Sequence, residues 1–207
     1  MGYHRAGFVV TGVDLYPQPN YPFAFHQADA LEYVKEHGHE FDVIHASPPC
    51  QAYSTITRPE ARVRHIRLIE PTRLALAATG SPYVIENVAG ARAQLIDPMM
   101  LCGSSFDLAV RRHRFFESNV TLGSLPCRHV NGAPPIGVYG GHPDTKHYLR
   151  PGLGTSRGRR ATSNEQASAA LGGVSWMNWH EMTESIPPAY TEHIGKQLLA
   201  HIVTVSA

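Results

Sequence analysis

Three short apolar runs, separated by segments with helical spacing, constrain the fold of this chain most strongly. The runs are GFVVTGVD at residues 7–14, FDVIHA at 41–46 and PYVIENV at 82–88. Between them, residues 29–37 carry apolar side chains on one helical face, and a second helix is predicted to end at Ala78. Strands that alternate with helices in this way indicate a parallel sheet with crossover helices, and therefore an α/β fold.

The composition divides the chain into three parts. Its 207 residues, of which 43% are hydrophobic, suffice for one globular domain with a small appendage. Glycine, proline, arginine and histidine dominate from about residue 118 to about residue 166, without a clear period. We therefore predict a core at 1–117, a loop-rich insertion at 118–166 that does not fold alone, and a segment at 167–207 whose C-terminal helix returns to the core.

Charge, hydropathy and cysteine usage restrict the partners of the chain. Its formal net charge is +1, so any contact with a polyanion depends on local clusters. No apolar run reaches the roughly 18 residues of a membrane span, and no signal peptide opens the chain. Cys50, Cys102 and Cys127 are odd in number and form no CxxC pair, which is typical of reduced thiols and not of a disulfide framework or a zinc site. We predict a soluble cytoplasmic protein without a membrane partner or a metal, in which Cys102 and Cys127 are structural.

The stretch HASPPCQAYS, at residues 45–54, places a cysteine in an unusual position. Pro48 and Pro49 exclude both a helix and a central strand, so the chain must leave the preceding strand in a stiff, extended turn. Cys50 is then held at the mouth of the sheet, where open α/β folds bind their ligands. This position suggests a nucleophile, and the alternative is an ordinary small buried cysteine.

Glu86 is a carboxylate in the middle of the apolar run VIENV. Burial without a partner costs a carboxylate several kcal/mol, and a raised pKa would let Glu86 donate a proton near neutral pH. The alternative is a glutamate that faces solvent at the end of the strand. Since Cys50 and Glu86 both lie towards the C-terminal ends of parallel strands, they can point into one crevice. A thiolate beside a carboxylic acid suits addition to an electron-poor ring.

Two aspartates follow the predicted first strand. Asp14 closes this strand and is suited to bind ribose hydroxyls of a nucleoside cofactor, or it is a turn residue that faces water. Asp29, in QADAL, can accept a hydrogen bond from an exocyclic amine of adenine. It can equally be the N-cap of the helix that follows, and one side chain can serve both purposes.

The run RRHR at residues 111–114 is the first of two basic regions. Alternation along a strand would put Arg112 and Arg114 on one face, where their guanidinium groups suit a phosphate or a base carbonyl oxygen. The alternative is a solvated basic edge strand. Basic and aromatic residues also gather in the insertion, as a weak candidate for contact with nucleic acid: Tyr139, His142, His147, Tyr148, Arg150, Arg157, Arg159 and Arg160.

Taken in order, PPCQ at 48–51, ENV at 86–88 and the arginine pair of RRHR resemble the motifs of cytosine-5 DNA methyltransferases, especially short phage-encoded ones. AGFVVTGVD and QADAL are similar to the cofactor-binding stretches of the family. The resemblance covers most of residues 1–118 and, more loosely, the ending ESIPPAYTEHIGKQLL. It implies a Rossmann-like, S-adenosylmethionine-dependent methyltransferase fold with a mostly parallel sheet.

The resemblance also implies a mechanism, in which a cytosine is flipped out of double-stranded DNA. Cys50 adds to ring carbon 6, Glu86 stabilises the adduct through ring N3 and the exocyclic amine, and carbon 5 accepts the methyl group. The other roles follow from the motifs: Arg112 and Arg114 hold the base carbonyl oxygen and the nearby backbone, Pro48 and Pro49 shape the turn, Asn87 braces it, and Asp14, Leu15, Asp29, Ala30 and Pro48 bind S-adenosylmethionine. We expect a monomer, acting in a bacterial host cell if it is phage-encoded.

The chain departs from the family pattern at four places. MGYHRAGF resembles the helix after the glycine-rich cofactor loop, so the central first strand and that loop are missing. Val110 replaces a usual glutamine, and the region after Ser118 is shorter than a usual target-recognition domain. IGKQLL replaces a GN-containing ending.

Two other functions therefore stay open: a catalytically impaired fragment of the same fold that binds DNA, and a related enzyme that modifies free pyrimidine nucleotides. A dinucleotide-dependent oxidoreductase is disfavoured because GxGxxG is absent. An exocyclic-amine DNA methylase is disfavoured because such enzymes usually carry an aromatic residue at the position of Cys50. The target sequence and the biological role do not follow from the sequence.

Overall fold

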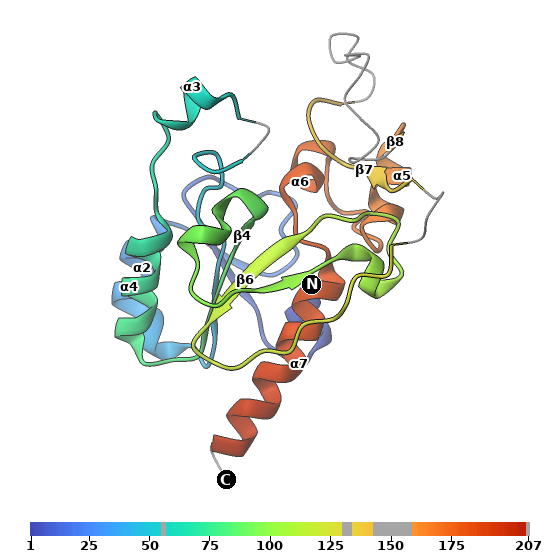
Figure 1. Ribbon diagram of the computed structural model, residues 1–207. Coiled ribbons are helices and arrows are strands. Elements are labelled where there is room, and N and C mark those ends of the chain that lie inside the picture. The colour runs from blue at the N-terminus through green and yellow to red at the C-terminus, as the bar shows by residue number, and fades with distance from the viewer. Residues whose placement is uncertain (55–56, 130–133, 143–158, 206–207) are drawn as a thin grey trace.

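The computed structural model describes residues 1–54, 57–129, 134–142 and 159–205 (Figure 1). Its strands are β1 (Thr11–Asp14), β2 (Ala24–Gln27), β3 (Ile44–Ala46), β4 (Tyr83–Val88), β5 (Met99–Leu101), β6 (Arg114–Ser118), β7 (Ile136–Gly137) and β8 (Arg159–Arg160). Its α-helices are α1 (Gly2–Arg5), α2 (Ala30–His37), α3 (Pro59–Arg62), α4 (Ile69–Thr79), α5 (Asn164–Ala170), α6 (Trp179–Glu184) and α7 (Pro188–Val205). Three 3₁₀ helices are η1 (Gly38–Glu40), η2 (Ala89–Gln94) and η3 (Gly103–Phe106).

The largest sheet has four strands in the order β3-β4-β6-β5. β3 and β4 are parallel, as predicted, whereas β6 runs antiparallel to both of its neighbours. The chain is therefore a mixed α/β protein whose main sheet is less parallel than predicted. The connection from β5 to β6, residues 102–113, contains the 3₁₀ helix η3 but no α-helix, and antiparallel neighbours need no crossover helix.

The predicted first strand does not join this sheet. β1 pairs instead with β2 in a separate parallel pair, in which Asp14 lies opposite Gln27. β2 was not predicted from the sequence, and the first apolar run forms a strand only from Thr11 onwards. In the described part of the chain, β1 and β3 each have a strand on one side only.

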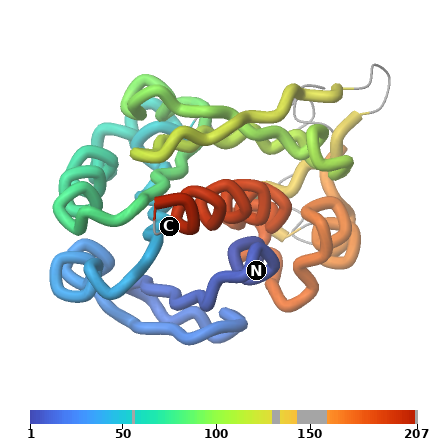
Figure 2. Tube along the Cα trace, turned by 90° about the horizontal axis from the view of Figure 1, so that it is seen from below, coloured from blue at the N-terminus to red at the C-terminus, as the bar shows by residue number. Residues whose placement is uncertain are grey.

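Alternation along β4 divides the core into two layers around the main sheet. Ile85 packs with Ile69 and Leu76 of α4, while Val84 on the other face packs with residues of α7. Figure 1 shows α2 and α4 together on one side of β4 and β6, and Figure 2 shows α7 along the other side. Helices thus cover both faces of the sheet.

The helix α7 joins the two ends of the chain to the sheet. Its residues Tyr190, Ile194 and Leu198 are fully buried. A Cβ on Gly2 of α1 would lie 2.2 Å from the carbonyl oxygen of Pro188 in α7, so the backbones of the two helices are in close contact at this glycine. Although α7 has 18 residues, no helix within the described ranges is both long and apolar enough to cross a membrane.

A second hydrophobic cluster lies beside the sheet. It unites nine buried side chains: Val110, Val138, Ala161, Ala167, Ala170, Leu171, Val174, Trp179 and Met182. Helices α5 and α6 therefore pack with β7 and β8, and only α7 returns to the sheet. The boundary predicted at residue 166 cuts through this cluster, because its members lie far apart in sequence.

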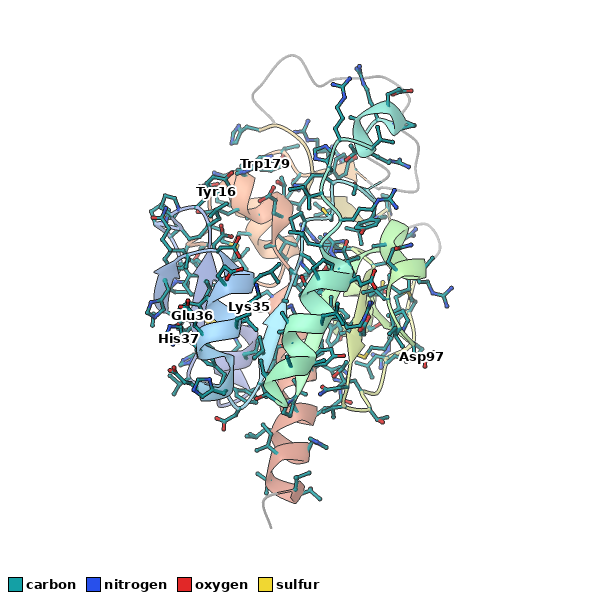
Figure 3. The ribbon with its side chains drawn as sticks, turned by 90° about the vertical axis from the view of Figure 1, so that its left-hand side faces the viewer. Tyr16, Lys35, Glu36, His37, Asp97 and Trp179 are labelled. Atoms are coloured by element: carbon teal, nitrogen blue, oxygen red, sulfur yellow. The ribbon has the colours of Figure 1, made fainter. Side chains whose placement is uncertain are left out.

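The helix α2 has a charged, solvent-facing surface. Lys35, Glu36 and His37 point away from the molecule (Figure 3). Lys35 Nζ lies 2.7 Å from Glu32 Oε1, and His37 Nδ1 lies 2.8 Å from Glu40 Oε1. Such exposed pairs stabilise a helix only slightly.

Candidate active site

Cys50 lies in a tight turn directly after β3. The carbonyl oxygen of Cys50 accepts hydrogen bonds from the backbone N–H groups of Tyr53 and Ser54, both at 2.9 Å. Pro48 is buried, Pro49 is exposed, and the Cys50 side chain is half-buried. The two prolines end the strand, as predicted, and Cys50 is not a fully buried core cysteine.

Two contacts brace this turn against β4 and the segment that follows it. The side-chain amide of Asn87 donates to the carbonyl oxygen of Pro48 at 2.9 Å, a contact compatible with the bracing role that the family resemblance implies for Asn87. The Asn87 Oδ1 accepts from the Val88 N–H, also at 2.9 Å. Gly90 passes so close that a Cβ there would lie 2.1 Å from the carbonyl oxygen of Tyr53. The backbone around Cys50 is therefore fixed from two sides.

Glu86 is buried in β4 and paired, with only 6% of its surface exposed. Its Oε1 lies 2.9 Å from Arg114 Nε, and the Ser47 side chain hydrogen-bonds to it. Burial raises the pKa of Glu86 above its usual value, although Arg114 and Ser47 oppose this shift. The solvent-facing alternative for Glu86 is therefore wrong, and its carboxyl group is more readily protonated than an exposed one.

The charges around Cys50 come from the same residues. Burial raises the pKa of the Cys50 thiol, the nearby Arg114 lowers it, and Glu86 raises it further. The thiol form therefore predominates at neutral pH in the protein without substrate. A nucleophilic role requires that the thiol loses its proton in the reaction, and Arg114 is the cation that favours this loss.

Arg114 and Arg112 reach the site in different ways. Arg114 begins β6 opposite Val88 of β4, which places its side chain diagonally across from Glu86. Arg112 lies before the strand, in a left-handed conformation with φ of 38°. The prediction that strand alternation puts both arginines on one face is therefore wrong. Even so, the charge of Arg112 lowers the pKa of Glu86, so both arginines lie near this carboxylate.

Contacts to distant backbone groups hold Arg112 in its unusual conformation. Its Nη2 donates to the carbonyl oxygen of Thr183 in α6, and Nη1 donates to that of Val138 at 3.4 Å. The Tyr190 hydroxyl group donates to the carbonyl oxygens of Arg111 and Arg112, at 3.1 and 3.0 Å. Burial and the neighbouring Arg114 lower the pKa of Arg112 to about 9. Within the described residues, its buried Nε has no hydrogen-bond partner.

Four of the five predicted cofactor residues lie at or after the carboxyl ends of β1 and β2, whereas the fifth, Pro48, lies in the turn after β3. Asp14 Oδ1 accepts from the Tyr16 N–H at 2.8 Å, so Asp14 forms a turn, and Leu15 beside it is exposed. Asp29 Oδ1 caps α2, which begins at Ala30, by accepting from the N–H groups of the second and third helical residues. The turn and N-cap interpretations are therefore confirmed, and each aspartate uses Oδ1 for them.

The basic region of the insertion is described in part. His147, Tyr148, Arg150 and Arg157 lie outside the described residues, so their predicted contact with nucleic acid stays a prediction. The guanidinium group of Arg160 lies 5.5 Å from the centre of the Trp179 ring, whose Nε1 donates to the Gly140 carbonyl oxygen at 2.7 Å. Arg160 thus packs on the second hydrophobic cluster.

Sequence reasoning missed a hydrogen-bonded chain that leads to Glu86. The Tyr3 hydroxyl group lies 2.6 Å from His45 Nδ1, and His45 Nε2 lies 3.2 Å from the Ser47 Oγ, which in turn bonds to Glu86. Burial lowers the pKa of His45 to about 4, so its ring is neutral. A histidine two residues before Ser47 of the SPPC turn was the available signal.

Sequence reasoning also assigned no metal site to Cys102 and Cys127. The structure brings both cysteines together with His113 and His129. No family model matches this chain, and no curated protein matches it.

Proposed function

We propose that the chain is a DNA cytosine-5 methyltransferase with a Rossmann-like fold. One observation carries the proposal: Asn87 hydrogen-bonds the Cys50 turn to the strand that contains Glu86, and Glu86 pairs with Arg114. The thiol comes from the turn that follows β3, and the buried carboxyl group and the arginine come from the adjacent strands β4 and β6. The motifs PPCQ, ENV and RRHR contribute these residues.

The chemistry follows from what each residue can do to a cytosine ring. The Cys50 thiolate forms a bond to carbon 6, and a protonated Glu86 donates to ring N3, so that electron density moves to carbon 5. After carbon 5 has gained a methyl group, water takes its proton, the double bond between carbons 5 and 6 forms again, and the bond from carbon 6 to sulfur breaks to release the Cys50 thiolate. Arg114 stabilises the thiolate before addition, and the unpartnered Nε of Arg112 is a donor for the base carbonyl oxygen.

The residues of the β1–β2 pair fit a nucleoside cofactor. Asp14 and Asp29 lie at the same edge of two parallel strands, where such folds bind nucleotides. Each uses Oδ1 within the chain, which leaves a second carboxylate oxygen for a ribose hydroxyl or an amine. S-adenosylmethionine bound there would supply the methyl group.

In the described part of the chain, the strands of the candidate site are divided between the β1–β2 pair and the β3-β4-β6-β5 sheet. A strand between β1 and β3 would unite the β1–β2 pair with the β3-β4-β6-β5 sheet. The same division favours a second candidate function, a protein that binds DNA without transferring methyl groups, because the cofactor residues are not fixed by the sheet that carries Cys50 and Glu86. Binding of S-adenosylmethionine by the purified chain, measured by calorimetry, discriminates between the two.

Expression in cells that lack cytosine methylation tests the first candidate. We expect 5-methylcytosine in their DNA by nucleoside mass spectrometry, and its loss in Cys50→Ser and Glu86→Gln. The matched control is His39→Ala, which changes an exposed side chain. A methyl signal that persists in Cys50→Ser contradicts the assigned chemistry.

A further inference from the structure

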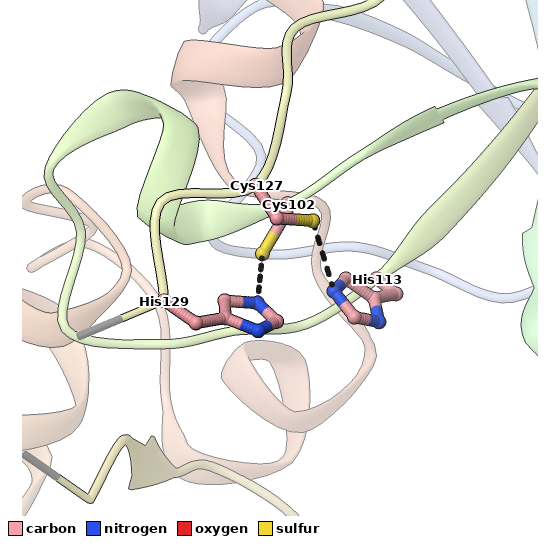
Figure 4. Close-up of side chains that lie close together, drawn as sticks. All are labelled: Cys102, His113, Cys127 and His129. Carbon is pink, nitrogen blue, oxygen red and sulfur yellow. Dashed lines mark hydrogen bonds between the residues drawn. The ribbon is translucent and has the colours of Figure 1, made fainter. Parts of the chain in front are cut away.

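Two cysteines and two histidines form a compact cluster near the N-terminal end of β6 (Figure 4). Cys102 follows β5, His113 directly precedes β6, and Cys127 and His129 lie on the loop after β6. His129 Nε2 lies 3.2 Å from Cys102 Sγ, and His113 Nε2 lies 3.5 Å from Cys127 Sγ. All four nitrogen and sulfur atoms lie within 4.8 Å of one another.

These separations are close to those of a tetrahedral zinc site. Zinc–sulfur bonds of about 2.3 Å and zinc–nitrogen bonds of about 2.0–2.1 Å place tetrahedral ligand atoms about 3.3–3.8 Å apart. Of the two sulfur–nitrogen distances, 3.5 Å lies within this range and 3.2 Å lies just below it. Even the 4.8 Å upper limit requires the cluster to contract by only about 1 Å.

We propose that Cys102, His113, Cys127 and His129 bind one zinc ion. Two thiolates and two neutral imidazoles are a usual ligand set of structural zinc sites, and no position is left open for a substrate. On binding, each thiol loses its proton, so two protons are released and the site of two thiolates and one Zn²⁺ has no net charge. A site without net charge suits Cys102, which is fully buried.

The surroundings of the cluster support the thiolate of Cys102 and fix the ligand-bearing loop. The Ser104 Oγ lies 3.1 Å from Cys102 Sγ and accepts from the N–H of Arg128, the residue between the other two loop ligands, at 3.0 Å. The Ser105 hydroxyl group donates to the carbonyl oxygen of Pro126 at 2.8 Å. Outer hydrogen bonds of this kind orient the ligands of metal sites.

The backbone also brings the first two ligands together. The N–H of Gly103 donates to the carbonyl oxygen of Arg111 at 2.7 Å, and a Cβ on Gly103 would lie 2.0 Å from the carbonyl oxygen of Val110. The rings of His113 and His129 are stacked, with centroids 5.3 Å apart. Three separate segments of the chain thus bring their cysteine and histidine side chains to one place.

The site has a structural consequence for the candidate active site. His113 lies between Arg112 and Arg114 in sequence, so a metal that holds His113 also fixes where β6 begins. The Arg114–Glu86 pair depends on this register. The zinc proposal itself needs no catalytic activity and is tested separately.

Metal analysis of the full chain tests the proposal. The protein is purified without a histidine tag, in reducing buffer with a weak chelator, and its zinc content is measured by inductively coupled plasma mass spectrometry. We expect about one zinc per chain, falling to near zero in Cys102→Ser and in His129→Ala. The matched controls Cys50→Ser and His39→Ala retain their zinc.

Reconstitution with cobalt uses only the wild-type protein, so this second test of the zinc site does not depend on whether the variants fold. Wild-type protein is stripped of metal, kept reduced and titrated with Co²⁺, and circular dichroism verifies its secondary structure. We expect a thiolate-to-cobalt charge-transfer band, intense tetrahedral visible bands and saturation at one equivalent. Cobalt spectra without the thiolate band, reduced protein that binds no metal, or a Cys102–Cys127 disulfide in freshly isolated protein would each overturn the proposal.

Discussion

The side-chain amide of Asn87 lies 2.9 Å from the carbonyl oxygen of Pro48, and this hydrogen bond joins the strand of Glu86 to the turn of Cys50. Asn87 is 1% exposed, so water cannot replace the amide if it is removed. The bond therefore determines how rigidly the thiol is presented to the carboxyl group. Precise positioning of reacting groups is a large part of enzymatic rate enhancement.

Replacing Asn87 by alanine should weaken both stability and activity. The carbonyl oxygen of Pro48 would be left buried without a donor, which costs about 1–3 kcal/mol of unfolding free energy. Urea denaturation measures this loss, and 5-methylcytosine formation should fall with it. Asn20→Ala removes an exposed amide that binds Glu181 and should leave the unfolding free energy nearly unchanged. Equal stability of the two variants would contradict the bracing role.

The reactivity of Cys50 should rise with pH and depend on Arg114. Because burial raises the pKa of Cys50 and Arg114 lowers it, Arg114→Met should move the pKa higher. We expect alkylation of Cys50 by iodoacetamide to accelerate towards alkaline pH, and to need a higher pH in Arg114→Met. Peptide mass spectrometry separates Cys50 from the other two cysteines. An unchanged pH profile in the variant would show that Arg114 does not act on the thiol.

The buried His45 should make the fold sensitive to mild acid. Its pKa is lowered to about 4, so at pH values between this and about 6.5 the unfolded chain binds a proton that the folded chain does not. Stability is therefore complete above the unfolded pKa and decreases as the pH falls, by about 2 kcal/mol at about pH 5. Urea midpoints of wild type and His45→Gln, measured near pH 7 and near pH 5, separate the contribution of His45 from that of the other histidines. Parallel losses in both proteins would contradict it.

The sequence predicted the positions of Cys50, Glu86 and Asn87 better than that of Arg112. Pro48 and Pro49 act through local backbone geometry, and VIENV is a buried strand whichever partners it has, so Cys50, Glu86 and Asn87 could be placed from short segments. Arg112 could not, because its left-handed conformation depends on Tyr190, which lies far along the chain in α7.

Two further features were inaccessible to local patterns. The strand β2 (AFHQ) has only four residues, three of them exposed, and its two apolar residues are adjacent, so it lacks the apolar alternation that predicts a strand. The four ligands of the proposed zinc site come from three segments, and their spacing matches no common zinc motif. Only the packing of β5, β6 and the following loop brings these side chains together.

Covalent capture on DNA tests the central claim most directly. The purified chain is incubated with S-adenosylmethionine and duplex DNA that contains 5-fluorocytosine, whose fluorine cannot leave carbon 5 as a proton does. We predict a protein–DNA adduct that survives denaturation, maps to Cys50 by mass spectrometry and is absent in Cys50→Ser. An adduct at another residue, or DNA binding with no adduct while unmodified cytosine is methylated, would contradict the assignment of Cys50 as the nucleophile.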